Sequence, residues 1–217
     1  MINRKYSFFI IITTLLLWAL IFFVIPFKTE TIFLGKTMGT TYEVKIAQNL
    51  SNYNQDIIHQ DIDSILNSIN QSMSTYIPNS EISLINKDEV VFKSFSVSNN
   101  FKYVLNKSLE YYFLTEGAFD VTIKPLLNLW GFRGGAISKE PDISAINNIT
   151  EYVGSNKIKF KGNQLTKMHP KLQLDFGAIA KGYAIDQISD YLIQSGYKVH
   201  YVEIGGEIIC KGKKWNI

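Results

Sequence analysis

The chain has 217 residues, with 22 lysine and arginine residues against 19 aspartate and glutamate residues and a formal net charge of +3. This length suits one ordinary domain plus an extension, and the small charge without a basic run argues against nucleic acid as the main partner. The one cysteine, Cys210, allows neither an internal disulfide nor a cysteine-based metal cluster, and the three histidines show no metal-ligand spacing.

The N-terminal segment has the pattern of a membrane-spanning helix. Arg4 and Lys5 precede an uncharged apolar run from about Phe8 to Phe27. About twenty such residues span a bilayer core, and positive charge ahead of them keeps the N-terminus in the cytoplasm. No good cleavage site stands near Pro26, so residues 1–28 are expected to be an uncleaved anchor rather than a cleaved signal peptide. The rest of the chain would then face outward from the inner or plasma membrane, into the periplasm.

Residues 29–217 read as one mixed α+β domain. Residues 40–46 alternate apolar with polar side chains, as a half-buried strand does, and a helix with Asn54 as its N-cap candidate should follow. Its core face is a set of five residues: Ile58, Ile62, Ile65, Ile69 and Met73. Further helices are expected over residues 99–116 and 142–153, and two strands around the turn at residues 161–163.

Two polar stretches in this domain each have two interpretations. Residues 74–81 form a turn in which Tyr76 either packs or stacks on a planar ligand. Asp120 stands before a segment that contains Pro125, and it either caps that segment or meets a ligand. Taken alone, Asp120 favours the cap.

Residues 172–196 predict a strand end at Leu172 and Leu174, a glycine turn and a helix closed by Gly196. A turn into a helix start exposes backbone N–H groups that suit an anion such as a phosphate. Lys181 lies in the first turn, where the helix dipole disfavours a cation, so its charge should answer a partner. Asp175 either caps the helix or receives a ligand hydrogen bond. The simpler alternative is an ordinary strand–turn–helix.

A strand over residues 199–204 is followed by Gly205 and Gly206 and then by a second apolar run. A double glycine between two strands is either a hairpin turn or a point where the backbone approaches a ligand closely. With the preceding helix start, it would make a cradle for a nucleotide phosphate.

These stretches, in this order, resemble the ApbE family of flavin transferases (FAD:protein FMN transferases). The resemblance rests on six segments: residues 35–40, 74–76, 117–120, 125–132, 175–186 and 205–206. It implies an α+β mixed-sheet domain that cleaves FAD at its pyrophosphate and attaches FMN to a threonine of a target protein through a phosphoester. It also implies magnesium as the cofactor, and flavin-accepting subunits of membrane redox complexes as partners.

The resemblance also implies site residues. Those expected to contact FAD are Met38, Tyr76, Ala118, Phe119, Asp120, Asp175 and Lys181. Tyr76 suits the flat ring system and Lys181 the phosphates, while Ala178 would offer its backbone carbonyl to magnesium.

The chain departs from the family at its C-terminus, because members continue for about another hundred residues after a tryptophan like Trp215. The expectation is therefore a domain that is incomplete there, as a fragment or the product of a disrupted gene, unless a second chain supplies the rest. Two rival functions remain open: an inactive FAD-binding fragment, and an anchored structural domain whose glycine turns are only turns.

Overall fold

The computed structural model describes residues 12–18, 30–132 and 140–213. After the first of these ranges it contains seven strands, six α-helices and one short 3-10 helix within the described residues. In chain order they are β1 (Thr31–Thr37), β2 (Thr40–Ile46), α2 (Asn52–Met73), α3 (Glu81–Lys87), β3 (Ser94–Ser96), α4 (Asn99–Leu114), α5 (Lys124–Leu129), α6 (Ile143–Thr150), η1 (Ser155–Lys157), β4 (Ile158–Lys161), β5 (Gln164–Lys167), α7 (Ala180–Gln194), β6 (His200–Ile204) and β7 (Glu207–Lys211).

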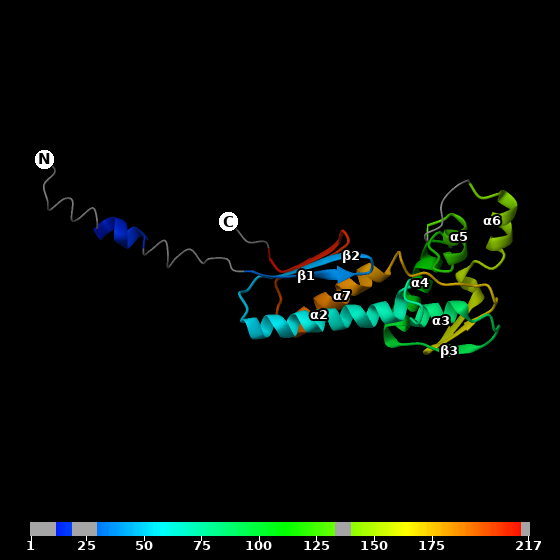
Figure 1. Ribbon diagram of the computed structural model, residues 1–217, viewed down its shortest axis with the longest axis horizontal. Coiled ribbons are helices and arrows are strands. Elements are labelled where there is room, and N and C mark those ends of the chain that lie inside the picture. Colours follow the sequence, from blue (N-terminus) through cyan, green and yellow to red (C-terminus); the bar gives the residue numbers. More distant parts are fainter. Residues whose placement is uncertain (1–11, 19–29, 133–139, 214–217) are drawn as a thin grey trace.

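A four-stranded antiparallel sheet forms one end of the molecule, with strand order β1-β2-β6-β7 (Figure 1). The long helix α2 and helix α7 pack on the same face of this sheet. Tyr42, Val44 and Ile46 on β2 are buried on that face, and the residues between them are more exposed. The strand predicted over residues 40–46 is therefore confirmed with its bounds.

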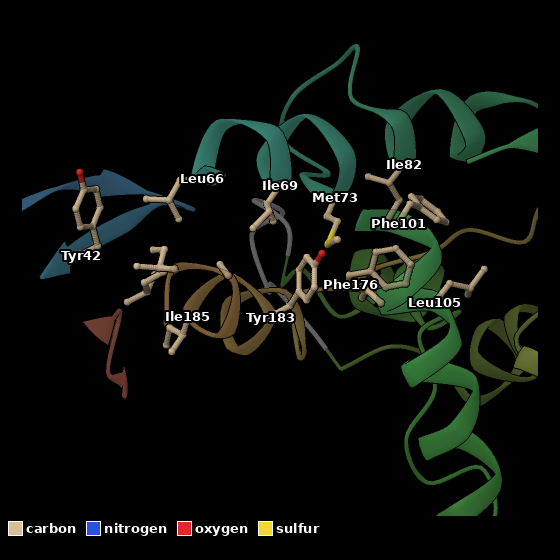
Figure 2. Packing of buried hydrophobic residues seen from close by; sticks show 14 of the residues in the cluster. Tyr42, Leu66, Ile69, Met73, Ile82, Phe101, Leu105, Phe176, Tyr183 and Ile185 are labelled. Atoms are coloured by element: carbon tan, nitrogen blue, oxygen red, sulfur yellow. The ribbon is translucent and has the colours of Figure 1, made fainter. Parts of the chain in front are cut away.

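The other end of the molecule holds α3, α4, α5, α6 and a small antiparallel sheet of order β3-β5-β4 (Figure 1). Two antiparallel sheets with helices packed against them, rather than a parallel sheet of βαβ units, make an α+β fold, as the sequence predicted. The two ends share one core, because α2 runs between them: Leu66, Ile69 and Met73 lie along α7, and the ring of Phe101 on α4 meets Phe176 edge-on at 5.0 Å (Figure 2).

Two tyrosine–aspartate hydrogen bonds fix α2 against its neighbours. The Tyr42 hydroxyl on β2 donates to Asp63 at 2.7 Å, and the Tyr191 hydroxyl on α7 donates to Asp61 at 2.6 Å. Burial, together with the hydrogen-bonded carboxylate, raises the pKa of Tyr191 to about 12, so the hydroxyl keeps its proton and remains a donor. The middle of α2 is thereby tied to both β2 and α7.

Several details differ from the expectations. The N-cap of α2 is Ser51, whose hydroxyl accepts from the Asn54 backbone, so Asn54 is not the cap. Leu172 and Leu174 are buried but do not belong to a strand; only an isolated bridge joins Gln173 to Ile123. Asp120 does not cap the segment with Pro125, since the N-cap residue of α5 is Ile123 and no described side chain caps this helix.

The predicted anchor lies largely outside the described residues. Of residues 1–28, the structure describes residues 12–18, which are helical and exposed. Across the described ranges, no helix is both long and apolar enough to cross a bilayer.

His200 on β6 is buried between α7 and the chain that precedes its own strand. Its Nδ1 lies 2.7 Å from the carbonyl oxygen of Tyr197, to which it must donate, and its Nε2 accepts from the Ser189 hydroxyl at 2.8 Å. Burial lowers the pKa of His200, because the charged imidazolium would lose its solvation.

This lowered pKa predicts acid sensitivity. Below about pH 6.5 the unfolded chain protonates His200 while the folded chain resists it, so the free energy of unfolding should fall as pH drops; at higher pH neither state is charged. Denaturant unfolding between about pH 7.5 and 5.5 should show a shallower slope for His200→Gln than for the wild type. Parallel slopes would mean that His200 does not carry the effect.

Candidate functional site

A cavity of about 580 Å³ opens where the β1–β2 turn, the C-terminal end of α2 and the start of α7 meet. It is lined by Met38, Gly39, Ile69, Asn70, Met73, Ser74, Thr75, Tyr76, Ile77, Asp175, Gly177, Ala180 and Lys181. Four residues expected to contact FAD are among them: Met38, Tyr76, Asp175 and Lys181. Segments separated by more than a hundred residues in the chain thus converge on one site.

The first wall is the turn between β1 and β2. Met38 and Gly39 connect the paired residues Thr37 and Thr40, with φ angles of 50° and 76°. Such a two-residue turn requires positive φ at both central positions, which is uncommon for a methionine. The side chain of Asn70 on α2 donates to the Thr37 hydroxyl at 3.0 Å, so the turn is tied to the floor of the cavity.

The second wall is the short loop between α2 and α3. The hydroxyls of Ser80 and Ser83 both donate to the backbone oxygen of Ser74, at 2.6 and 3.3 Å. Ser80 is also the N-cap of α3, so the loop is fixed at both ends. On this fixed loop Tyr76 stands at the cavity with 73% of its surface exposed.

The third wall carries a buried carboxylate. Asp175 is held through its backbone N–H, which donates to the Val121 oxygen at 2.8 Å, and through the preceding Leu174, whose backbone is paired on both sides with the Asn86 side chain. Its own carboxylate accepts from the Gly177 N–H at 2.8 Å. Asp175 therefore closes the turn before α7, and α7 itself begins without a side-chain cap.

Lys181 in the first turn of α7 has a partner within the chain. Its ammonium forms an ion pair with Glu207 at the start of β7, with an Nζ–Oε1 distance of 2.5 Å. The expectation that this charge answers a partner is met by Glu207 in the free protein. Gly205 and Gly206, just before Glu207, form the hairpin turn between β6 and β7.

The segment of Ala118, Phe119 and Asp120 does not line the cavity. Phe119 packs edge-on against Tyr111, with ring centroids 5.8 Å apart, and Ala118 lies in the turn after α4. Asp120 accepts four hydrogen bonds, two from Thr122 and two from Ser155, at 2.7–3.0 Å. The segment leads directly to Val121, whose oxygen holds Asp175, so it adjoins the site through the backbone.

These four bonds predict a structural cost for removing the carboxylate. Asp120→Ala should lower the free energy of unfolding by about 1–3 kcal/mol, because charged acceptors satisfy several donors at once. Asp56→Ala, which removes an exposed carboxylate on the surface of α2, is the matched control. Equal losses in the two variants, measured by denaturant unfolding, would contradict this role for Asp120.

Ala178 lies in the exposed turn between Gly177 and α7, beside the cavity. Among the described residues no group of three or more histidine, cysteine, aspartate or glutamate side chains could hold a metal ion. A metal here would take backbone carbonyl, phosphate or water oxygens, which are the ligands that magnesium accepts.

Sequence reasoning assigned the end of α2 to the core alone. Ile69 and Met73 do pack in the core, but they also line the cavity together with Asn70. Helical spacing identifies a buried face and cannot show where that face reaches a ligand. A second cavity of about 410 Å³ near the stacked rings of Tyr152 and His169 holds none of the predicted site residues.

Comparison with known proteins identifies the family that the sequence motifs resemble. A family profile described as the ApbE family matches residues 38–217. The chain is 38% identical over 182 residues to the FAD:protein FMN transferase of Vibrio cholerae, covering 82% of this chain and 53% of the relative. It is also 38% identical over 185 residues to the protein of that name from Haemophilus influenzae, covering 82% of this chain and 54% of the relative. The chain thus spans about half the length of the curated relatives it matches.

Solved structures agree with these matches. The flavin transferase ApbE from Vibrio cholerae superposes with a TM-score of 0.81 at 37% identity, over 86% of this chain and 60% of that chain. The apo form of the Pseudomonas stutzeri flavinyl transferase ApbE superposes with a TM-score of 0.79 at 31% identity, over 86% of this chain and 62% of that chain.

Proposed function

The chain belongs to the ApbE family, and on that premise we propose that it acts in FAD:protein FMN transfer. The observation that carries the proposal is the convergence of Met38, Tyr76, Asp175 and Lys181 on one cavity. An aromatic side chain at the cavity, a buried carboxylate and a lysine at a helix start are the groups that a flavin with a pyrophosphate needs.

Each wall has a share in holding FAD. Tyr76 stacks on the isoalloxazine ring, and Met38 contributes apolar surface on the opposite wall. Lys181 and the first turn of α7 bind the phosphates, since both carry positive charge or partial charge. Asp175 accepts a hydrogen bond from the ligand. Ala118, Phe119 and Asp120 support this end of the site through Val121.

In the reaction, the hydroxyl oxygen of an acceptor threonine forms a bond to the FMN phosphorus. The pyrophosphate P–O bond breaks, AMP leaves, and the hydroxyl proton is lost to a base. Lys181 lies where it can offset the phosphate charge. Magnesium, held by the Ala178 carbonyl together with phosphate and water oxygens, would supply further charge neutralisation when bound.

The acceptor and the location are part of the same proposal. We place the domain outside the inner or plasma membrane, in the periplasm, attached by residues 1–28, with flavin-accepting subunits of membrane redox complexes as targets. The support for attachment is the uncharged apolar run behind Arg4 and Lys5. Retention of the protein in the membrane fraction after alkaline washing is the expected result, and a soluble form shortened near Lys28 would contradict it.

Transfer itself is tested with the chain, FAD, magnesium and an acceptor domain that contains a threonine. Covalent flavin fluorescence on the denatured acceptor, lost when that threonine is replaced by alanine, would support the proposal. Free FAD bound by the chain without any covalent product would reduce the proposal to flavin binding.

Stacking on Tyr76 is tested by a matched pair of tyrosines. Tyr76→Ala should weaken FAD binding by about 1–3 kcal/mol, the range for aromatic stacking on a base. Tyr53→Ala is the control, because Tyr53 is 74% exposed against 73% for Tyr76 but lies at the far end of α2. Equal FAD affinities of both variants in a fluorescence titration would contradict stacking of FAD on Tyr76.

A further inference from the structure

The ion pair between Lys181 and Glu207 links the cavity to the β6–β7 hairpin. Lys181 lines the cavity, whereas Glu207 is paired with Lys181 and is not itself among the described lining residues. The two side chains keep 31% and 40% of their surface exposed, so the pair is in contact with solvent.

The hairpin fixes the Glu207 carboxylate in this place. Gly205 and Gly206 have φ angles of 56° and 91°, and a Cβ on Gly205 would come within 2.8 Å of the Thr40 side chain. On the helix side, a Cβ on Gly182 would lie 3.4 Å from Glu207 Oε2. Gly205 therefore allows the hairpin to approach β2 closely, whereas the contact at Gly182 is an ordinary one that shows how near the carboxylate lies to the first turn of α7.

The ion pair stabilises the charge of Lys181, but the Glu207 carboxylate disfavours an anionic ligand at the same place. A lysine in the first helical turn is disfavoured by the helix dipole, and the Glu207 carboxylate offsets that cost. A phosphate at the same helix start would, however, meet two carboxylates, Asp175 and Glu207, beside one ammonium. Binding of the phosphate therefore requires Lys181 to exchange partners.

We propose that Glu207 competes with the ligand phosphate for Lys181 and thereby lowers the affinity of the site for anionic flavins. The proposal rests on the proposed function, since it assumes that a flavin phosphate reaches Lys181. Glu207 would then contribute to selectivity. It would not change the affinity for a flavin without phosphate, and it would lower the affinity for a flavin that carries phosphate groups.

The test is a series of flavins that differ in charge. Binding of riboflavin, FMN and FAD to the full chain is measured in EDTA, for the wild type, Glu207→Gln and Glu207→Asp. Glu207→Gln is nearly isosteric, and should tighten FMN and FAD by about twofold to fivefold, the upper range for one exposed charge pair, while leaving riboflavin unchanged. Glu207→Asp keeps the charge and should stay near the wild type. Glu110→Gln, which breaks the pair of Lys107 and Glu110 on α4, should change nothing.

The outcomes separate this inference from the function it builds on. If Glu207→Gln left the affinity for each of the three flavins unchanged, the proposed competition would be wrong. It would also be wrong if the variant bound all three flavins more weakly, because Glu207 would then only support the fold. Failure of the wild type to bind FAD at all would instead contradict the proposed function. Added salt gives a second readout, because FAD binding by Glu207→Gln should weaken more steeply with ionic strength than that of the wild type.

Discussion

Replacing Lys167 by methionine should lower the free energy of unfolding by about 1.5–3 kcal/mol, the range for hydrogen bonds that involve a charged group. Lys167 at the end of β5 is 0% exposed, and its ammonium donates to four backbone oxygens, those of Ile85, Asp88, Pro170 and Leu172. Methionine fills a similar volume but leaves these oxygens without their shared donor. Burial lowers the pKa of Lys167, which is the sign of an ammonium held in place at a cost in solvation.

The control is Lys159→Met on the neighbouring strand β4, where the side chain is exposed. Denaturant unfolding should show little change in that variant. A loss below about 1 kcal/mol for Lys167→Met would contradict the view that the four oxygens depend on it. Because Pro170 and Leu172 lie only a few residues before Asp175, partial loss of FAD binding is expected alongside the loss of stability.

Replacing Lys181 by alanine should weaken FAD binding by about 1.5–3 kcal/mol, the range for a hydrogen bond to a charged group. Among the described residues that line the cavity, Lys181 carries the positively charged donor. The partial charge at the start of α7 is smaller than the full charge of this ammonium. FAD and FMN should both lose affinity, whereas riboflavin, which has no phosphate, should lose little. Equilibrium titration of flavin fluorescence measures all three.

Lys107→Ala on α4 is the matched control, because it also breaks a lysine–glutamate pair but lies away from the cavity. Lys181→Arg, which keeps the charge, should retain most of the affinity. Unchanged FAD binding in Lys181→Ala would contradict the proposal that Lys181 binds the FAD phosphates.

The elements that follow simple periodicity were predictable from sequence. Residues 40–46 alternate, α2 has helical spacing, and Gly196 closes α7 in a left-handed conformation with φ of 91°. The strand β1 was not predicted, because Ile32 and Leu34 are apolar and yet lie on its exposed face, which hides the alternation. The short helix α3 was missed because polar Ser83 and Asn86 are among its buried residues.

Sequence patterns could not predict the polar contacts between residues that are far apart in the chain. Asn86 pairs with Leu174 across 88 residues, and Lys167 with Ile85 across 82. A lysine is ordinarily expected at the surface, so its burial follows only from the carbonyl oxygens that the fold brings around it. The convergence of Met38, Tyr76, Asp175 and Lys181 was implied by family resemblance rather than by spacing, and Glu207 entered only through the structure.

The most direct test of the account is to locate FAD on the protein by hydrogen exchange. With FAD added to the full chain, the backbone amides of residues 38–39, 74–77 and 175–182 should exchange more slowly, since these segments surround the cavity. Protection of these three segments is the predicted result, and it should be reduced in Lys181→Ala at an FAD concentration that half-saturates the wild type. Protection confined to the second cavity around Tyr152 and His169, or none at all at saturating FAD, would contradict the assignment of the site.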